Sequence, residues 1–343
     1  MKRQAGVLLH ITSLPGRFGT GTLGAPAQLF LDFLADAGFT AWQILPVNPL
    51  GEGFSPYQSP ASLGINPLLL DPDILVKNGL LLPEELPACT DPEFVDYSYI
   101  AAEWDRMLML ATARSGEPNF AEAEFYRQWS SLQAYAHARG IEIIGDLPIY
   151  VAPNSKDILA NPDLFLQNVV AGCPPDAFSA TGQRWNNPLY DWCAMEKDGY
   201  QFWISRIAHA KKLFDRIRLD HFRGFVAYWA IPEHAPDASF GQWLPGPGEA
   251  LFRALFHALG SLPLIAEDLG YITEDVHALR RALHIPGMAV LQFAFDAPES
   301  AYLPDRITED TVCYTGTHDN DTTFGWACAD TKQVLRAMKY FQV

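Results

Sequence analysis

The amino-acid sequence predicts an α/β protein built on a (β/α)8 TIM-type barrel, and three observations carry this prediction. Short apolar runs of strand length alternate with segments of helical period along most of the chain. Such alternation produces parallel strands joined by helices. The runs end in polar or charged residues, as barrel strands do at the mouth where active sites lie. We count seven strands and expect the last strand and helix of the barrel to be missing.

The predicted strands follow one another at intervals that leave room for helices between them. They are centred near Leu8, Gln43, Ile143, Arg218, Ile265, Val290 and Cys313. Helical spacing is clearest over 26–37, 101–112, 120–139, 202–214, 250–259 and 273–283. Pro26 suits the first turn of the first helix, and Gly38 suits its C-terminal cap.

Two longer segments interrupt this rhythm, after the second and third strands. Residues 50–125 are rich in proline, glycine and acidic residues, and we expect an inserted helical subdomain there. Residues 151–198 have no clear strand or helix period, and we expect a loop that covers a substrate, because long irregular segments in compact domains are usually lids or binding loops. Both belong to one catalytic barrel domain, 1–343, which we expect to be incomplete at its C-terminus.

Composition restricts the class of ligand. The net charge of −16 and a pI near 4.9 argue against nucleic acid and anionic membranes, which select for Lys and Arg. Aromatic residues make up 13%, with nine tryptophans. Aromatic rings beside carboxylates suit a neutral sugar, whose apolar faces stack and whose hydroxyls form hydrogen bonds.

The cysteines and the chain start indicate a compartment. There are five cysteines, an odd number without a CxxC pair, which is typical of reduced thiols in a cytosol. No apolar segment approaches the roughly 20 residues of a membrane span, and the short run after Met1 has no cleavage site. We expect a cytoplasmic protein.

Three strand ends present a carboxylate. Asp220 follows the fourth strand, Glu267 or its neighbour Asp268 the fifth, and Asp319 the seventh. In a barrel these ends converge on one mouth. Paired carboxylates flanking a glycosidic bond, one a nucleophile and one an acid, are the machinery of retaining glycoside cleavage. Arg218 lies two residues before Asp220, on the same strand face, where its charge keeps a nucleophilic carboxylate ionised.

Other polar and aromatic residues lie at strand ends and in the long segments. Asp146 ends the third strand. Glycines and a proline shape a turn that displays Tyr57 and Gln58. The 151–198 segment concentrates an acid, Asp176, with Trp185 and several amides, a set that a sugar-binding lid would use.

A metal site is the competing interpretation of the acidic residues. Asp220, Glu267, His318, Asp319 and Asp321 include side chains that ligate Mg²⁺ or Zn²⁺. The sequence has no closely spaced ligand pair of the His-x-His kind, and Arg218 would bring a cation close to the metal. We therefore expect neither a metal nor a cofactor.

The chain resembles the 4-α-glucanotransferases called amylomaltase or disproportionating enzyme, relatives of the α-amylase superfamily. Seven motifs in the family's order carry this resemblance: His10–Gly16 with Gly24, Ser55–Ser59, Gly145–Tyr150, Gly182–Trp185, Arg218–Phe225, Ala266–Gly270 and Tyr314–Thr322. Two positions depart from the family's usual residues, namely Asn154 in place of an aspartate and Leu159 in place of a tryptophan.

The resemblance implies a role for each matched residue. It makes Asp220 the nucleophile, Glu267 rather than Asp268 the general acid/base, and Asp319 the transition-state stabiliser. The substrate-binding residues that it implies are Arg218, His318, Tyr57, Ser55, Gln58, Asp146, Asp176, Trp185 and His221. The implied substrates are α-1,4-glucans and maltooligosaccharides.

The expected function is transfer of α-1,4-glucan segments to an acceptor glucan or glucose through a covalent glycosyl-aspartate intermediate. Two alternatives stay open. An amylase-type hydrolase would use the same acids, with water as acceptor. A truncated chain could be an inactive or merely glucan-binding fragment, or one half of a split enzyme.

Overall fold

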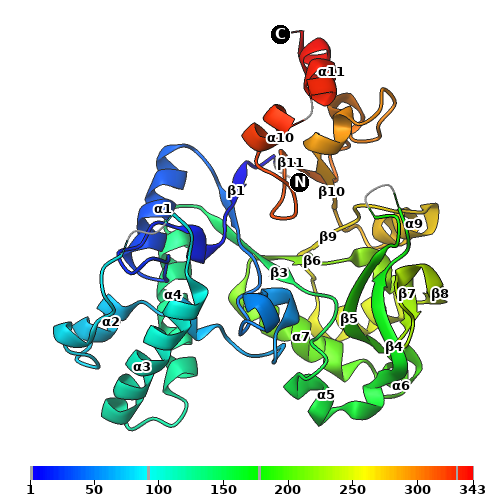
Figure 1. Ribbon diagram of the computed structural model, residues 1–343. Coiled ribbons are helices and arrows are strands. Elements are labelled where there is room, and N and C mark those ends of the chain that lie inside the picture. Colours follow the sequence, from blue (N-terminus) through cyan, green and yellow to red (C-terminus); the bar gives the residue numbers. More distant parts are fainter. Residues whose placement is uncertain (1–2, 91–92, 177–178, 330, 343) are drawn as a thin grey trace.

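The computed structural model describes residues 3–90, 93–176, 179–329 and 331–342 and is organised around five parallel strands (Figure 1). In sheet order they are β1 (Gly6–Leu8), β2 (Ala41–Gln43), β3 (Glu142–Leu147), β6 (Arg216–Leu219) and β9 (Leu264–Ala266). A second parallel pair consists of β10 (Gly287–Val290) and β11 (Thr311–Tyr314). The N–H of Ala266 donates to the carbonyl of Pro286 (2.8 Å) and so joins β9 to the start of β10.

All seven predicted strands are confirmed, and their order in space follows their order in the sequence. This is the arrangement of a TIM-type barrel. Among the described residues no strand pairing joins β11 to β1, so the series does not close into a ring. One side-chain contact spans the interior, where the Tyr314 hydroxyl donates to Oε1 of Gln43 (2.5 Å).

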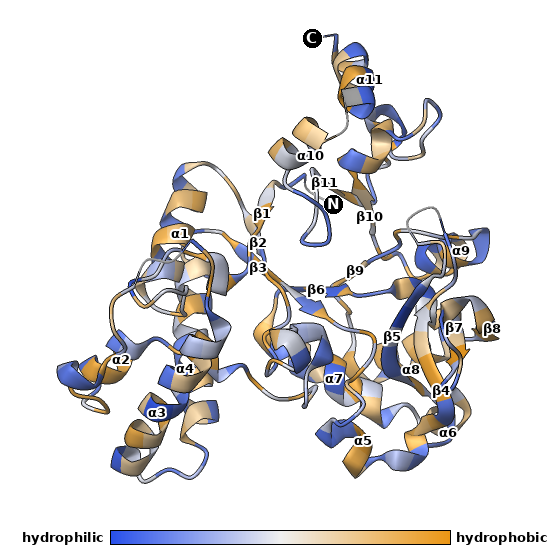
Figure 2. Ribbon diagram, viewed as in Figure 1, coloured by the Kyte–Doolittle hydropathy of each residue, from blue (hydrophilic) through white to orange (hydrophobic). Residues whose placement is uncertain are grey.

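Helices connect these strands and cover them, within two residues of the predicted ranges. They are α1 (Ala25–Asp36), α4 (Phe120–His137), α7 (Gln201–Leu213), α8 (Glu249–Leu259) and α9 (Glu274–Ala282). Each carries apolar and polar residues (Figure 2), and each buries several apolar side chains in the core. Trp129 of α4 is an example: its indole N–H donates to the carbonyl of Leu213 at the end of α7 (3.0 Å). Burial of such a side chain contributes about 1.5–3 kcal/mol.

The segment between β2 and α4 is helical, as the sequence predicts. It contains α2 (Pro72–Lys77), α3 (Tyr97–Ser115) and short 3-10 turns such as η2 (Glu52–Phe54) and η3 (Pro56–Gln58). Asp71 caps α2 by accepting the N–H of Ile74 (3.0 Å). The indole of Trp104 donates to the carbonyl of Leu70 (3.0 Å) and ties α3 to the chain before α2.

The prediction that residues 151–198 form an irregular loop is wrong. This part of the chain supplies α5 (Lys156–Ala160), β4 (Phe165–Cys173), β5 (Gln183–Tyr190) and α6 (Trp192–Lys197). With β7 (Ala227–Pro232) and β8 (Gln242–Pro245), the two strands form an antiparallel sheet of order β5-β4-β7-β8. Asn168 and Asn186 have positive φ, and the β4–β5 register shifts, so the period-two alternation that marks a strand is broken.

The last part of the chain forms its own small cluster. After β10 come the 3-10 turns η9 (Leu291–Phe295) and η10 (Pro304–Arg306), and after β11 come α10 (Thr323–Ala329) and α11 (Thr331–Phe341). Phe295 is the centre of the cluster, packed with Ala294 and Leu303. Within the described residues, none of the helices is long and apolar enough to cross a membrane.

Candidate active site

The candidate active site lies where β3, β6 and β9 end. Asp146 is the fifth residue of β3, Asp220 directly follows β6, and Glu267 directly follows β9. Backbone hydrogen bonds hold the last two in place: the N–H of Asp220 donates to the carbonyl of Leu147 (3.1 Å), and the N–H of Glu267 to that of Leu219 (3.0 Å). The predicted convergence of strand ends is therefore realised for these acids.

Arg218 joins two of the acids. It is 3% exposed and is the register partner of Asp146 across β3 and β6. Its Nη1 donates to both oxygens of Asp146 (2.8 Å each) and to Oδ1 of Asp220 (3.0 Å). Burial opposes its charge, but the two carboxylates raise the pKa of Arg218 well above its ordinary value. Asp220 therefore faces a permanent cation, a suitable partner for a carboxylate nucleophile.

Glu267 has the opposite environment. Its Oε2 accepts the N–H of His221 (2.8 Å) and its Oε1 the N–H of Leu269 (2.9 Å). Burial raises the pKa of Glu267 to about 7; Arg218 opposes this shift, and the negative charge of Asp220 adds to it. Near neutral pH a large fraction of this carboxyl is protonated. Asp220 and Glu267 thus have different environments, as expected for a nucleophile and an acid.

Tyr57 connects the turn formed by η2 and η3, called the 50s turn below, to the barrel. Its hydroxyl donates to Oδ2 of Asp146 (2.7 Å) and lies 2.8 Å from Nε2 of His318. The rings of Tyr57 and His318 stack with centroids 5.5 Å apart. Burial, and then Asp146, raise the pKa of Tyr57 well above 10, so the phenol keeps its proton.

The tautomer of His318 follows from this contact. Because the single hydroxyl proton of Tyr57 is given to Asp146, Nε2 of His318 must be the donor to the Tyr57 oxygen. Nδ1 of His318 is buried and has no hydrogen-bond partner among the described residues.

Asp319 is less enclosed than the other two acids. Its side chain is 71% exposed, and its Oδ1 lies 3.4 Å from Nε2 of His318. It follows β11, whose hydrogen-bonded partner is β10 rather than the five-stranded sheet. The structure places it beside His318, at the rim of the mouth.

Two predicted binding segments are tied together across the mouth. Nε2 of Gln58 donates to Oδ1 of Asn187 (3.0 Å) and to the carbonyl of Trp185 (3.4 Å), which links the 50s turn to β5. The Trp185 ring meets His221 edge to face, with centroids 4.9 Å apart. Trp185 and His221 therefore line the same wall as the nucleophile.

The two remaining predicted residues have local partners. Oγ of Ser55 accepts the N–H of Tyr57 (3.2 Å) and caps the turn that presents this tyrosine. Asp176 is exposed in the β4–β5 connection, and its Oδ1 accepts the N–H of Ser179 (2.8 Å). Neither contact brings the side chain to the buried acids.

His10 belongs to this site, although the prediction included it only in a motif. Burial, and then the nearby His318, lower the pKa of His10 to about 4, so the ring is neutral. Its Nδ1 is buried without a hydrogen-bond partner in the described part of the chain. His10 is the second residue after β1, so the same strand-end reasoning would have identified it.

Two other features of the described residues bear on ligands. No group of three or more His, Cys, Asp and Glu residues in these ranges is arranged to hold a metal ion.

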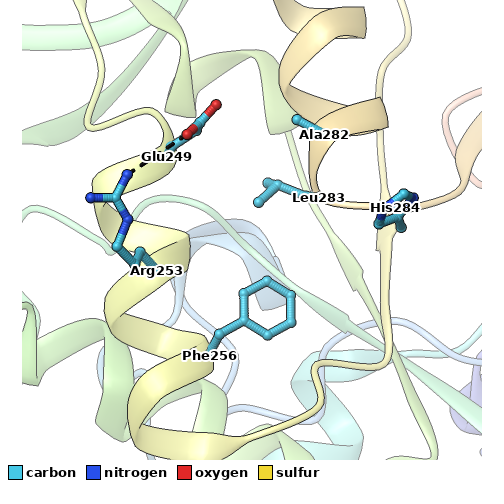
Figure 3. A pocket seen from close by; sticks show the side chains of 6 residues that line it. All are labelled: Glu249, Arg253, Phe256, Ala282, Leu283 and His284. Atoms are coloured by element: carbon cyan, nitrogen blue, oxygen red, sulfur yellow. Dashed lines mark ion pairs between the residues drawn. The ribbon is translucent and has the colours of Figure 1, made fainter.

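A separate hollow of about 360 Å³ lies between α8 and the end of α9 (Figure 3). Six residues line it: Glu249, Arg253, Phe256, Ala282, Leu283 and His284. Because α9 runs away from the strand ends, this hollow is distant from the acids.

Comparisons with known proteins agree on one family. A sequence profile of the 4-alpha-glucanotransferases matches residues 9–123 and 117–342. A 4-alpha-glucanotransferase of Thermus thermophilus is 41% identical over 400 residues, covering 95% of this chain and 80% of that protein. The structure of amylomaltase from Streptococcus agalactiae in complex with acarbose superposes with a TM-score of 0.90 at 33% identity, over 100% of this chain and 85% of that one.

The alignments also show a difference in length. The chloroplastic/amyloplastic 4-alpha-glucanotransferase of Solanum tuberosum is 41% identical over 404 residues, covering 95% of this chain and 70% of that protein. The aligned stretch is longer than the 343 residues of this chain, so the relative has additional residues inside it. The two profile matches overlap at residues 117–123, which span the connection after α3 and the first turn of α4.

Proposed function

This chain belongs to the 4-alpha-glucanotransferase family, glycoside hydrolase family 77, and we propose that it transfers α-1,4-glucan segments through a covalent intermediate on Asp220. The observation that carries the assignment of roles is the contrast between two neighbouring carboxyls. Asp220 accepts a hydrogen bond from Arg218, whereas burial raises the pKa of Glu267 to about 7. That contrast provides a nucleophile and an acid in one mouth.

The first half of the reaction uses both groups at once. A carboxylate oxygen of Asp220 attacks the anomeric carbon, the bond from that carbon to the glycosidic oxygen breaks, and the departing oxygen takes the proton of Glu267. Asp319, at the rim beside His318, stabilises the positive charge that develops on the sugar. The covalent intermediate is a glycosyl ester of Asp220.

In the second half, the acceptor replaces the leaving group. Glu267, now ionised, removes the proton of an acceptor hydroxyl, whose oxygen attacks the anomeric carbon and releases Asp220. Transfer rather than hydrolysis requires that an acceptor glucan reach the ester before water. Segments 50–125 and 151–198, joined by the Gln58 contacts to β5, are the proposed cover.

The remaining residues bind the sugar at the cleavage point. His318 and His10 each offer a buried ring nitrogen without a hydrogen-bond partner among the described residues, and sugar hydroxyls are suitable partners. Asp146 holds Arg218 and Tyr57 in position. Trp185 and Tyr57 present aromatic rings, and Ser55 orients Tyr57. Asp176 would reach the glucan from the β4–β5 connection.

The test is incubation of the purified chain with maltotriose and separation of the products. A ladder of longer and shorter maltooligosaccharides with glucose supports transfer. Glucose and maltose without longer products would show an amylase-type hydrolase, and binding without turnover would show an inactive fragment. Asp220→Asn should abolish the ladder while maltotriose binding persists; transfer at the parent rate would overturn the assignment of the nucleophile.

Cytoplasmic location is part of the same proposal. It rests on the five cysteines, all of which are free thiols in the structure. Fractionation of the source cells, with a cytosolic enzyme as marker, tests it.

A further inference from the structure

A cluster of aromatic rings lies next to the site and has no role in the reaction described above. Trp229 of β7 and Trp243 of β8 are cross-strand partners, with ring centroids 5.1 Å apart. Trp243 in turn stacks on Tyr271, with centroids 6.3 Å apart and planes 22° apart. The guanidinium of Arg223 lies 3.9 Å from the centroid of Trp243 and 5.2 Å from that of Tyr271.

The cluster is held in place although its outer ring is exposed. Arg223 is 7% exposed, and its Nη1 donates to the hydroxyl of Thr273 (3.0 Å), in the loop that carries Tyr271. The indole of Trp229 donates to the carbonyl of Ala238 (2.8 Å). Tyr271 itself is 61% exposed. A large ring that is fixed from behind and open in front is prepared for a ligand, because little side-chain entropy remains to be lost on binding.

The cluster adjoins Glu267 through the chain and through space. Tyr271 is four residues after Glu267, so their Cα atoms are at most about 14 Å apart. Arg223 is two residues after His221, whose N–H binds Glu267. Burial raises the pKa of the Cys173 thiol to about 12, with Glu267 adding to this and Arg223 opposing it, so Cys173 lies near both. The aromatic surface thus continues the wall of the mouth on the side of the acid.

We propose that Tyr271 and Trp243 form a stacking platform for glucosyl residues on the leaving-group and acceptor side of the cleft. Glu267 protonates the departing oxygen and later deprotonates the acceptor, so both glucans pass on its side. Glucose rings have apolar faces that stack on aromatic rings, and a neutral glucan suits a chain of net charge −16. This inference rests on the proposed function, since it names a subsite of the same cleft.

The test measures binding, so that it does not depend on turnover. In an Asp220→Asn background, we would titrate maltopentaose and maltose by isothermal calorimetry. Tyr271→Ala should weaken maltopentaose binding roughly three- to tenfold, the loss expected for one aromatic contact. The loss should be smaller for maltose, which is too short to occupy the whole cleft. Tyr271→Phe, which keeps the ring, should bind maltopentaose within about twofold of the parent.

Phe256→Ala is the matched control, because Phe256 is also an exposed aromatic residue (37%) in a hollow, but at the α8–α9 site of Figure 3. It should leave maltopentaose binding unchanged. The inference is wrong if Tyr271→Ala binds like the parent, if Phe256→Ala weakens binding instead, or if the parent binds no maltopentaose. If the Asp220→Asn parent binds maltopentaose, Tyr271→Ala weakens that binding, and the unsubstituted chain makes no maltooligosaccharide ladder, the proposed function is refuted and the platform is supported.

Discussion

The backbone N–H of His221 donates a hydrogen bond of 2.8 Å to Oε2 of Glu267, so the residue after the proposed nucleophile positions the proposed acid. His221 has a positive φ of 46°, an uncommon conformation for a residue other than glycine. Such conformations persist where the surrounding structure fixes them, often at functional sites. The turn after β6 therefore positions both reacting carboxyls.

Replacement of Glu267 by glutamine removes the acidic proton and keeps a side chain of nearly the same shape. We expect the rate of transfer from maltotriose to fall about 10²–10⁴-fold. In α-maltosyl fluoride the leaving group at the anomeric carbon is fluoride, which departs without protonation. Formation of the ester on Asp220 should therefore be nearly normal with this donor. Fluoride release, measured with an ion electrode, checks this. An equal loss with both donors would mean that Glu267 acts other than as an acid.

The pH dependence of ester formation should follow the same carboxyl. Because its pKa is raised to about 7, Glu267 is protonated below that pH and ionised above it. The acid-dependent step should therefore slow as pH rises through about 7, approaching a tenfold loss per pH unit. Single-turnover rates with maltotriose between pH 5 and 9 measure this. The fluoride donor is the control, and its rate of ester formation should not show that decline.

Tyr57→Phe tests the hydroxyl that links Asp146 to His318. The ring stacking on His318 remains, but the hydrogen bonds of 2.7 and 2.8 Å are lost. We expect a cost of about 1–2 kcal/mol, or a roughly five- to thirtyfold lower kcat/KM for maltotriose.

Tyr135→Phe is the matched control for this substitution. The Tyr135 hydroxyl also binds a carboxylate, that of Asp32 (3.0 Å), but on helices α4 and α1 outside the mouth. Its kcat/KM should equal that of the parent. Similar losses in both variants would indicate a general loss of stability rather than an effect at the site.

Arg218→Met should destabilise the fold, because it leaves the buried carboxylate of Asp146 without its cation. Asp146 is 2% exposed and accepts two hydrogen bonds from Arg218. Breaking a buried pair costs about 3–5 kcal/mol of unfolding free energy. Urea denaturation measures the loss. The double variant Arg218→Met/Asp146→Asn removes the unpaired charge and should be more stable than the single variant; no recovery would contradict this account.

The strand ends could be predicted because they are local features. An apolar run followed by a polar residue marks a strand and its end in a few positions, and the barrel brings such ends together. This reasoning located Asp146, Asp220 and the pair Glu267 and Asp268, and applied once more it would have located His10. It failed for β4 and β5, because residues of positive φ and register shifts break the alternation there.

By itself, the sequence determined the class of fold, the order of the strands and the acids that we propose for catalysis, because each depends on short-range patterns and motifs. Only the tertiary structure decided how the acids differ. Tyr57 meets Asp146 and His318 across 89 and 261 residues of chain, and no local pattern encodes such a contact. The charge of Glu267 likewise depends on burial and on the distances to Arg218 and Asp220, which exist only once β6 and β9 lie side by side.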